Sequence, residues 1–278
     1  MKTNTKIRIV GAVTALLSAG CIDNQTHPDL QPWLPSNTTP AGLGCIPNQD
    51  GVITGAELPV ALGITARNRL IFNRPVDLDG AIDAGGHRVW DWGWAAAGET
   101  ALAVTAEPIA NKWYASEFLG GQFAVAFDVA GYLDAVYAKE SDGLYLLGLV
   151  SRLENPTQGQ TLLRYDQPVK TVPLPLQPGA SWQAVGKVSA GKLYGMGYAG
   201  VDTYDSTADL AGRLLLPDLS LDQSIRVVTT VTANPVVGQA VIKQQVSFFT
   251  ECLGEVARAV GSNLLGGGQA QEVRRLAL

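Results

Sequence analysis

The chain has 278 residues, of which 46% are hydrophobic and 16% charged, and its formal net charge at pH 7 is −5. An acidic chain without a cluster of lysine and arginine lacks the positive surface that neutralises phosphates, so we expect no nucleic-acid partner. Composition alone indicates neither a reaction nor a ligand.

Residues 1–20 have the pattern of an export signal. The basic residues Lys2, Lys6 and Arg8 precede an apolar run over residues 9–17, which is followed by small residues. The run is shorter than the roughly 20 residues that a membrane-spanning helix needs. We therefore predict that this segment is removed and that the protein leaves the cytoplasm. The loss of its three positive charges takes the net charge from −5 to −8.

The end of this segment, Ser18-Ala19-Gly20-Cys21, resembles the lipobox of bacterial lipoproteins. The resemblance implies that Cys21 is lipidated and becomes the first residue of the mature protein, held at a membrane by several acyl chains. Asp23 is not directly after the cysteine, where in enteric bacteria it favours the inner membrane, so the outer membrane is implied. The family usually has leucine where this chain has Ser18, and a plain secretory signal cut near Ala19 or Gly20 is the alternative.

Two cysteines remain besides Cys21. In an oxidising compartment an even pair is most simply explained as a disulfide, so Cys45 and Cys252 are predicted to be bonded, with Cα atoms about 4.4–6.8 Å apart. The bond would fasten the start of the folded domain to its end. The alternative is two buried free thiols.

Proline and glycine mark the predicted boundaries. Residues 21–44 contain four prolines among polar residues and are predicted to form an extended tether. Residues 45–262 are predicted to form a β-rich globular domain, or two sub-domains that meet near 155–165. Residues 263–278 contain three consecutive glycines, Gly266 to Gly268, and are predicted to be a flexible tail.

The central region is predicted to be mainly β, with antiparallel sheets arranged as a sandwich or a curved half-barrel and with little helix. Short segments rich in β-branched and aromatic residues, bounded by turn residues, are typical of strands; the clearest are 122–128, 145–150, 225–232 and 240–249. Hairpin turns are predicted at 141–143, 189–191 and 234–238.

A second resemblance covers about 95 residues. The run of proline, leucine and glycine that ends at Trp182, together with Leu253-Gly-Glu-Val-Ala-Arg258, is similar to a broad group of uncharacterised bacterial envelope domains. This similarity implies a curved antiparallel sheet and supplies no activity.

One loop resembles most of an EF-hand calcium site. Oxygen-bearing residues and a glycine recur at the EF-hand spacing, and calcium prefers such a ring of hard oxygen ligands. The candidate ligands are Asn48, Asp50, Val52 (through its carbonyl), Thr54 and Glu57. The first ligand position holds Ile46 instead of aspartate. The alternative is structural: Thr54 and Glu57 have the spacing of a helix capping box, and Asp50 begins an ordinary turn.

Trp90, Trp92 and Trp94 alternate along the chain, so on a strand their rings would share one face. Such a face is either a wall of the hydrophobic core or an exposed platform for a sugar or an apolar ligand.

No catalytic motif is evident. The two histidines cannot supply both a zinc site and a base, and no nucleophile elbow is present, although paired carboxylates elsewhere could act as acid and base. We therefore expect a lipid-anchored envelope module without enzymatic activity, whose partner is an envelope protein or an apolar ligand. The alternatives are an envelope hydrolase with paired carboxylates and a carrier of an apolar ligand.

Overall fold

The structure is a computed structural model and describes residues 44–278. The predicted signal, Cys21 and the tether up to residue 43 lie outside the described residues. The described part contains fifteen strands and one 3₁₀ helix. In chain order these are β1 (Thr65–Arg74), β2 (Ala81–Ile82), β3 (Arg88–Asp91), β4 (Thr100–Thr105), β5 (Glu107–Pro108), η1 (Ala115–Glu117), β6 (Phe123–Ala126), β7 (Leu133–Glu140), β8 (Gly143–Ser151), β9 (Leu162–Pro173), β10 (Ser181–Leu193), β11 (Met196–Leu215), β12 (Ser220–Pro235), β13 (Val241–Thr250), β14 (Gly254–Gly261) and β15 (Ala270–Ala277).

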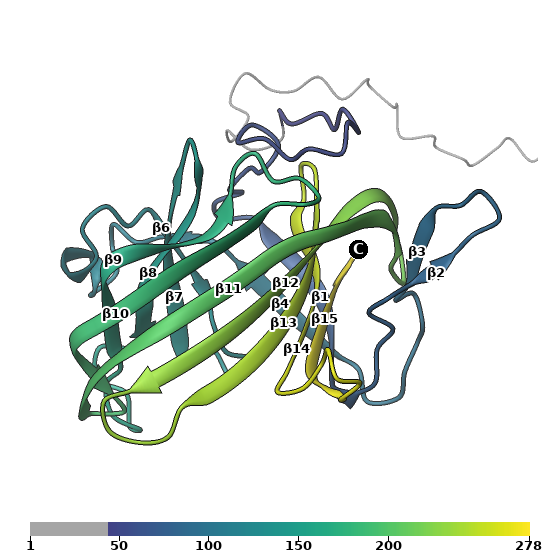
Figure 1. The fold of residues 1–278 in the computed structure, drawn as a ribbon. Coiled ribbons are helices and arrows are strands. Elements are labelled where there is room, and N and C mark those ends of the chain that lie inside the picture. Colours follow the sequence, from purple (N-terminus) through teal and green to yellow (C-terminus); the bar gives the residue numbers. More distant parts are fainter. Residues whose placement is uncertain (1–43) are drawn as a thin grey trace, which may run out of the picture. The chain divides into compact units, whose positions relative to one another are not determined.

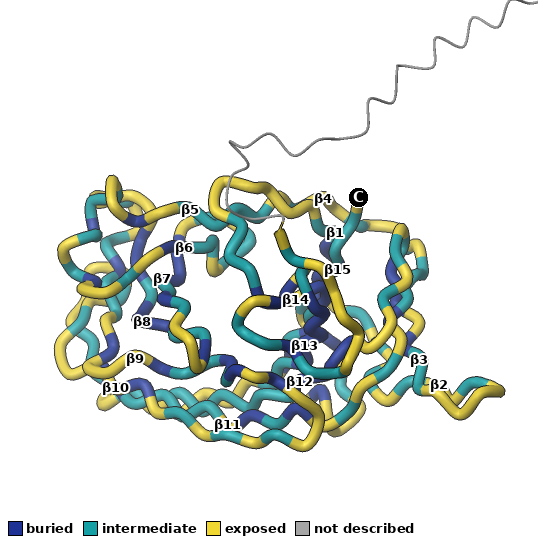
Figure 2. The backbone as a smooth tube through the Cα atoms, turned by 90° about the horizontal axis from the view of Figure 1, so that it is seen from above, coloured by how far each residue is buried: buried dark blue, intermediate teal, exposed yellow. Residues whose placement is uncertain are grey.

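Thirteen of these strands form one antiparallel sheet in the order β4-β1-β15-β14-β13-β12-β11-β10-β9-β8-β7-β6-β5. From β5 to β15 each strand pairs with the next one along the chain, as expected where short turns join antiparallel strands. The sheet curls until β4 and β6, from near its two ends, approach each other. The result is a nearly closed barrel, and Figure 2 shows the strand order running round a ring (Figures 1 and 2).

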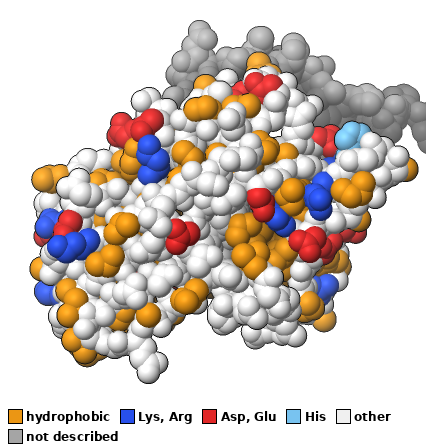
Figure 3. All heavy atoms as spheres, viewed as in Figure 1, with side chains coloured by type: hydrophobic (Ala, Val, Ile, Leu, Met, Phe, Trp, Pro, Cys, Tyr) orange, Lys and Arg blue, Asp and Glu red, His pale blue; other side chains and the backbone are white. Residues whose placement is uncertain are grey.

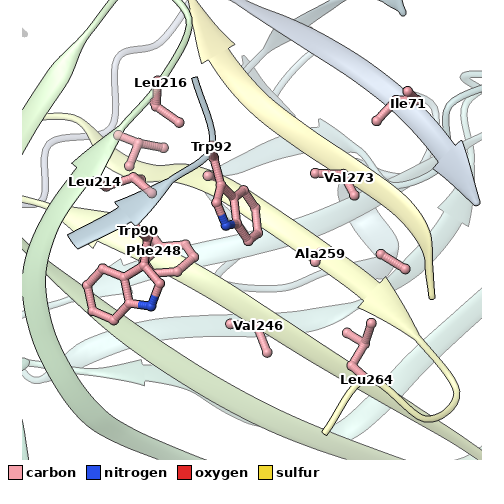
Figure 4. Packing of buried hydrophobic residues seen from close by; sticks show 13 residues of the cluster. Ile71, Trp90, Trp92, Leu214, Leu216, Val246, Phe248, Ala259, Leu264 and Val273 are labelled. Atoms are coloured by element: carbon pink, nitrogen blue, oxygen red, sulfur yellow. The ribbon is translucent and has the colours of Figure 1, made fainter. Parts of the chain in front are cut away.

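Part of the outer face is covered by the segment 76–94, which contains β3. Trp90 and Trp92 are fully buried and pack edge-to-face on Phe248 of β13, with ring centroids 4.9 and 5.1 Å apart (Figure 4). Their indole N–H groups donate to the carbonyls of Leu78 and Asp77. Burying two tryptophans with satisfied N–H groups makes this the main outer cluster of the core.

The far side of the barrel has a second cover, the segment 109–121. In β7, Val136 and Ala138 face outward and pack on Tyr114 and Phe118 of this segment. Alternate residues of a strand point to opposite faces, so Ala135 and its alternate neighbours face the barrel interior. Tyr114 donates a hydrogen bond to the buried Asp134 over 2.8 Å.

The N-terminal segment closes one end of the barrel. Ile53 and Leu58 are buried there against inward-facing residues of β9, β12 and β13, including Val227 and Phe249. Close by, the Cys45–Cys252 disulfide joins this segment to the turn between β13 and β14, with Cα atoms 5.4 Å apart. The predicted disulfide is confirmed.

The mainly β prediction with little helix is confirmed, and the barrel is closer to the half-barrel alternative than to a sandwich. The strand predictions agree with β6, β8, β12 and β13, and the turns at 141–143 and 234–238 fall between strands. The turn predicted at 189–191 is wrong, because a bulge there lets β10 continue to Leu193. Among the described residues no helix is long and apolar enough to cross a membrane.

The predicted domain boundaries need two corrections. The described residues, 44–278, belong to one compact unit, and 155–165 contains only the connection between β8 and β9 and the start of β9. Residues 270–277 are not a tail: they form β15, which lies between β1 and β14. The glycines at 266–268 belong to the turn before this strand.

Candidate ligand-binding site inside the barrel

A cavity of about 260 Å³ lies where the two ends of the sheet meet. We call it the seam cavity. Its walls come from strands at both ends of the sheet, and its rim includes the half-exposed side chains of Phe127 and Leu253. The main lining residues are Ala66, Asn68, Val104, Phe123, Val125, Ala135, Tyr137, Glu255, Arg258, Arg274 and Leu276. Most of the wall is apolar, with a few polar groups that converge from β7, β14 and β15.

Two arginines form the charged part of the wall. Arg258 of β14 and Arg274 of β15 are register partners, so their side chains leave the same face of the sheet. Ala259 and Val273, the next pair, point to the opposite face and pack in the tryptophan cluster. The sheet thus separates an apolar outer layer from a charged inner one.

The two guanidinium groups are satisfied to different degrees. Arg274 donates through Nε to Glu272 and through Nη2 to the carbonyl of Phe127. Arg258 reaches carboxylate oxygens of Glu255 and Glu272 only at 3.6 Å each, beyond hydrogen-bond distance. Its Nε is buried and has no hydrogen-bond partner among residues 44–278.

Hydrogen bonds from β13 hold the nearest carboxylate. The hydroxyl of Ser247 donates to Glu255 Oε1 over 2.6 Å, and Gln245 Nε2 donates to the same oxygen over 3.4 Å. The Oε2 atom is the one that faces Arg258.

The charges and burial shift the pKa values of these groups. Burial lowers the pKa of Arg258, but the carboxylates of Glu255 and Glu272 outweigh it and raise the pKa above its ordinary value. Burial, then the charge of Arg258, lowers the pKa of Arg274. Burial raises the pKa of Tyr137 to about 12, so its phenol is neutral at pH 7. The cavity wall therefore offers charged donors and a neutral hydroxyl.

A tyrosine–aspartate cluster lies further along the interior. The hydroxyl oxygen of Tyr165 lies 2.8 Å from Asp202 Oδ2 and 2.8 Å from the Tyr204 hydroxyl oxygen. Burial raises the pKa of Asp202, and the hydrogen bond from Tyr165 partly opposes this. Gly186 faces the Tyr165 ring, and a Cβ there would lie 2.6 Å from it, so only glycine leaves room for the ring.

The turns that join β10 to β11 and β12 to β13 lie at the end of the barrel away from the N-terminal segment (Figure 1). A larger groove of about 580 Å³ lies among them. Its lining is mostly small and apolar, with Val236 and Val237 exposed. Lys192 is the charged residue in its lining, and its ammonium group lies 3.3 Å from Gln160. Polar groups do not converge on this groove as they do on the seam cavity.

The calcium-like loop lies at the closed end of the barrel. Its oxygens accept hydrogen bonds from the chain itself: Asp50 Oδ1 from the Val52 amide, and Glu57 Oε2 from both the amide and the hydroxyl of Thr54. These are the contacts of the structural alternative. The described residues contain no group of three or more His, Cys, Asp or Glu side chains placed to hold a metal. Calcium binding here stays a prediction.

The tryptophans do not form an exposed platform. Trp90 and Trp92 are fully buried, which leaves no free ring face for a ligand and corresponds to the core alternative. Trp94 is partly buried, with the guanidinium groups of Arg74 and Arg275 at 3.7 and 3.6 Å from its ring centroid.

Sequence reasoning missed the arginines of the seam cavity. Charged residues within otherwise apolar strands could have indicated them. These residues are Glu255 and Arg258 in β14 and Glu272, Arg274 and Arg275 in β15. The charged residues of β15 were missed because residues 263–278 are predicted to be a flexible tail from the sequence alone. On the face shown in Figure 3, by contrast, basic side chains lie beside acidic ones in small mixed groups.

Comparisons with protein-family models, with curated proteins and with solved structures find no significant match to this chain.

Proposed function

We propose that the chain is an exported, lipid-anchored protein of the bacterial outer membrane that binds a small ligand, without catalysis, in the seam cavity. The observation that carries the binding function is the cavity itself: apolar walls, a few convergent polar groups, and the half-buried Arg258, whose buried Nε has no hydrogen-bond partner among the described residues. Ligand sites in proteins typically have this composition.

A purely structural role explains the cavity less well. Burying charge costs free energy unless the groups are closely paired and hydrogen-bonded. Arg258 lies beside the cavity, its Nε has no hydrogen-bond partner among the described residues, and its two carboxylate neighbours are 3.6 Å away, so its charge is only loosely paired. A ligand that accepts hydrogen bonds from Arg258 would supply the missing partner.

The lipobox resemblance at Cys21 supports the anchor, and the Cys45–Cys252 disulfide is consistent with a compartment outside the cytoplasm. A 24-residue tether before residue 45 would span at most about 80 Å, which leaves the barrel free of the membrane surface.

A hydrolase is the weaker candidate. The seam carboxylates are held by other groups: Glu255 accepts from Ser247, and Glu272 from Arg274. Asp202 has the raised pKa of an acid catalyst, but its hydrogen-bond partner is Tyr165 and not a second carboxylate. We therefore favour binding over catalysis.

The anchor is tested by expressing the full chain in a bacterium fed with labelled fatty acid. Wild-type protein should incorporate label and partition with the outer membrane, whereas Cys21→Ser should do neither while its barrel stays folded. Unlabelled wild-type protein in the soluble fraction would contradict the lipoprotein proposal.

Binding is tested by native mass spectrometry of protein extracted from its own membrane. We expect a small molecule to be retained by wild type and lost in Ala66→Trp, which places a large ring at the exposed rim of the cavity. The matched control is Ala103→Trp, because Ala103 is exposed on the other face of neighbouring β4. Equal retention by both variants would place the ligand elsewhere.

A further inference from the structure

We propose that the seam cavity binds a small apolar molecule ending in a carboxylate, with the carboxylate on the guanidinium of Arg258. This inference rests on the proposed function, since it names the class of ligand that the same cavity would take.

The first support is the unmet donor capacity of Arg258. A guanidinium has five N–H donors, and a buried donor without an acceptor is costly. The carboxylate oxygens of Glu255 and Glu272 lie 3.6 Å from its two Nη atoms, and its Nε has no partner among the described residues. Arg275, on the opposite face, also has an unpaired Nε, but its Nη1 donates to the carbonyls of Trp92 and Trp94, whereas the Nη atoms of Arg258 have only the ion pairs at 3.6 Å. Arg258 therefore has room for a further acceptor.

The second support is the charge of the cavity wall. Its charged lining residues are Arg258, Arg274 and Glu255, which leaves one positive charge facing the cavity. Glu272 balances the group as a whole, but its carboxylate accepts from Arg274 and is not part of the lining. Ser247 draws one oxygen of Glu255 away from Arg258. An incoming carboxylate would thus meet a guanidinium that its own neighbours hold loosely.

The third support is the shape of the two partners. A guanidinium and a carboxylate are both planar and form two parallel hydrogen bonds, which favours a carboxylate over a single hydroxyl or amide. A phosphate dianion would bring more charge next to Glu255. The carboxylate is therefore the head group that best fits one loosely held arginine.

The fourth support is the rest of the wall. Phe123, Val125, Ala135 and Leu276 make the remainder apolar, which suits a hydrocarbon body. At about 30 Å³ for each water-sized unit, a volume of about 260 Å³ accommodates on the order of nine heavy atoms. Octanoate, with ten, is a suitable probe.

The experiment measures binding of octanoate, octanol, octanamide and octyl phosphate by isothermal titration calorimetry. It uses the exported full chain carrying Cys21→Ser, so that acyl chains and detergent do not compete. We expect octanoate to bind at least tenfold more tightly than the other three probes. Ala66→Trp should abolish binding, and Ala103→Trp should leave it unchanged.

Arg258→Gln should weaken octanoate binding about 10- to 100-fold, as expected for loss of a charge-assisted hydrogen-bonded pair, and should weaken octanol binding much less. The matched control is Arg67→Gln, an exposed arginine that neighbours Ala66 and lies on the other face of β1. If Arg258→Gln fails to fold, the probe series on the parent chain and on Ala66→Trp still decides the outcome.

The outcomes separate the two proposals. Equal binding of octanoate and octanol, or tighter binding of octyl phosphate, overturns the carboxylate assignment and leaves the binding function standing. If no probe binds, the carboxylate assignment fails, and the native mass spectrum of wild type then decides whether the cavity holds any ligand.

Discussion

At the scale of single residues, buried charge is accommodated differently on the two faces of β15. Arg275 is fully buried, yet it donates to the carbonyls of Trp92 and Trp94, contacts Glu99 and stacks on the Trp94 ring. These contacts show how the tryptophan segment holds its arginine. Arg274, one residue earlier, points into the barrel and lines the seam cavity.

Replacing Asp202 should reveal a pH-dependent cost inside the barrel. Burial raises its pKa, so the folded state binds more protons than the unfolded state, and stability falls as pH rises through the window that begins near 3.9. Asp202→Asn removes this cost and still accepts from Tyr165. We expect the variant to gain stability over wild type at pH 7, and the gain to disappear below about pH 4.

Urea unfolding of both proteins between pH 3.5 and 8 checks this. The control is Asp205→Asn, which makes the same chemical change at an exposed position of the same strand. A stability difference for Asp202→Asn that is constant across the range would contradict the burial argument.

A second change of a single residue distinguishes the two interpretations of the loop at Glu57. The carboxylate accepts from the Thr54 amide and hydroxyl, and glutamine retains an acceptor oxygen for both. Glu57→Gln should therefore change the melting temperature little, in chelator or in millimolar calcium. Stabilisation of wild type by calcium that is lost in Glu57→Gln would instead favour a metal site, with the weak affinity of extracellular modules.

At the scale of elements, β15 is essential because it is internal. It pairs with β1 on one side and β14 on the other, and it supplies the fully buried Ala270 and Val273 to the tryptophan cluster. Without it, β1 and β14 each lose one of their two hydrogen-bonded neighbours, and the apolar face of the sheet is exposed. The three glycines at 266–268 therefore form the turn before β15. From the sequence alone they suggest a tail, because polar residues follow them.

Val273→Asp should prevent folding, since it buries an unpaired carboxylate in the core, a change of more than about 4 kcal/mol. Gln271→Asp is the matched control, because residue 271 is exposed on the same strand. Circular dichroism and solubility of the two variants check the prediction. A soluble, β-rich Val273→Asp protein would mean that β15 is dispensable, as a tail would be.

At the scale of the whole molecule, the disulfide links the N-terminal segment that closes one end of the barrel to the turn between β13 and β14. Ile53 and Leu58 fill one end, and Cys45 fastens their segment to Cys252, 207 residues later. A cross-link over so long a loop restricts the unfolded chain by up to about 5 kcal/mol in the chain-entropy model, and such bonds commonly contribute ~2–4 kcal/mol.

Cys45→Ser should therefore lower the free energy of unfolding by about 2–4 kcal/mol without removing the barrel. Urea unfolding of wild type under reducing conditions should give the same loss, which separates the bond from the side chain. If neither treatment changes the unfolding midpoint, the end of the barrel is held by packing alone.

Local chemistry explains what the sequence by itself determined. Runs of β-branched residues predicted β6, β8, β12 and β13, because strand formation depends on residues that are close in sequence. The Cys45–Cys252 bond followed from the number of cysteines that remain besides Cys21. The tertiary structure decided the rest. Curling of the sheet brings β4 to β6 and places Arg258 and Arg274 against strands more than a hundred residues away. Strand register also decided that Trp90 and Trp92 are core and that β15 is internal, because the face a side chain occupies depends on which strand lies beside it.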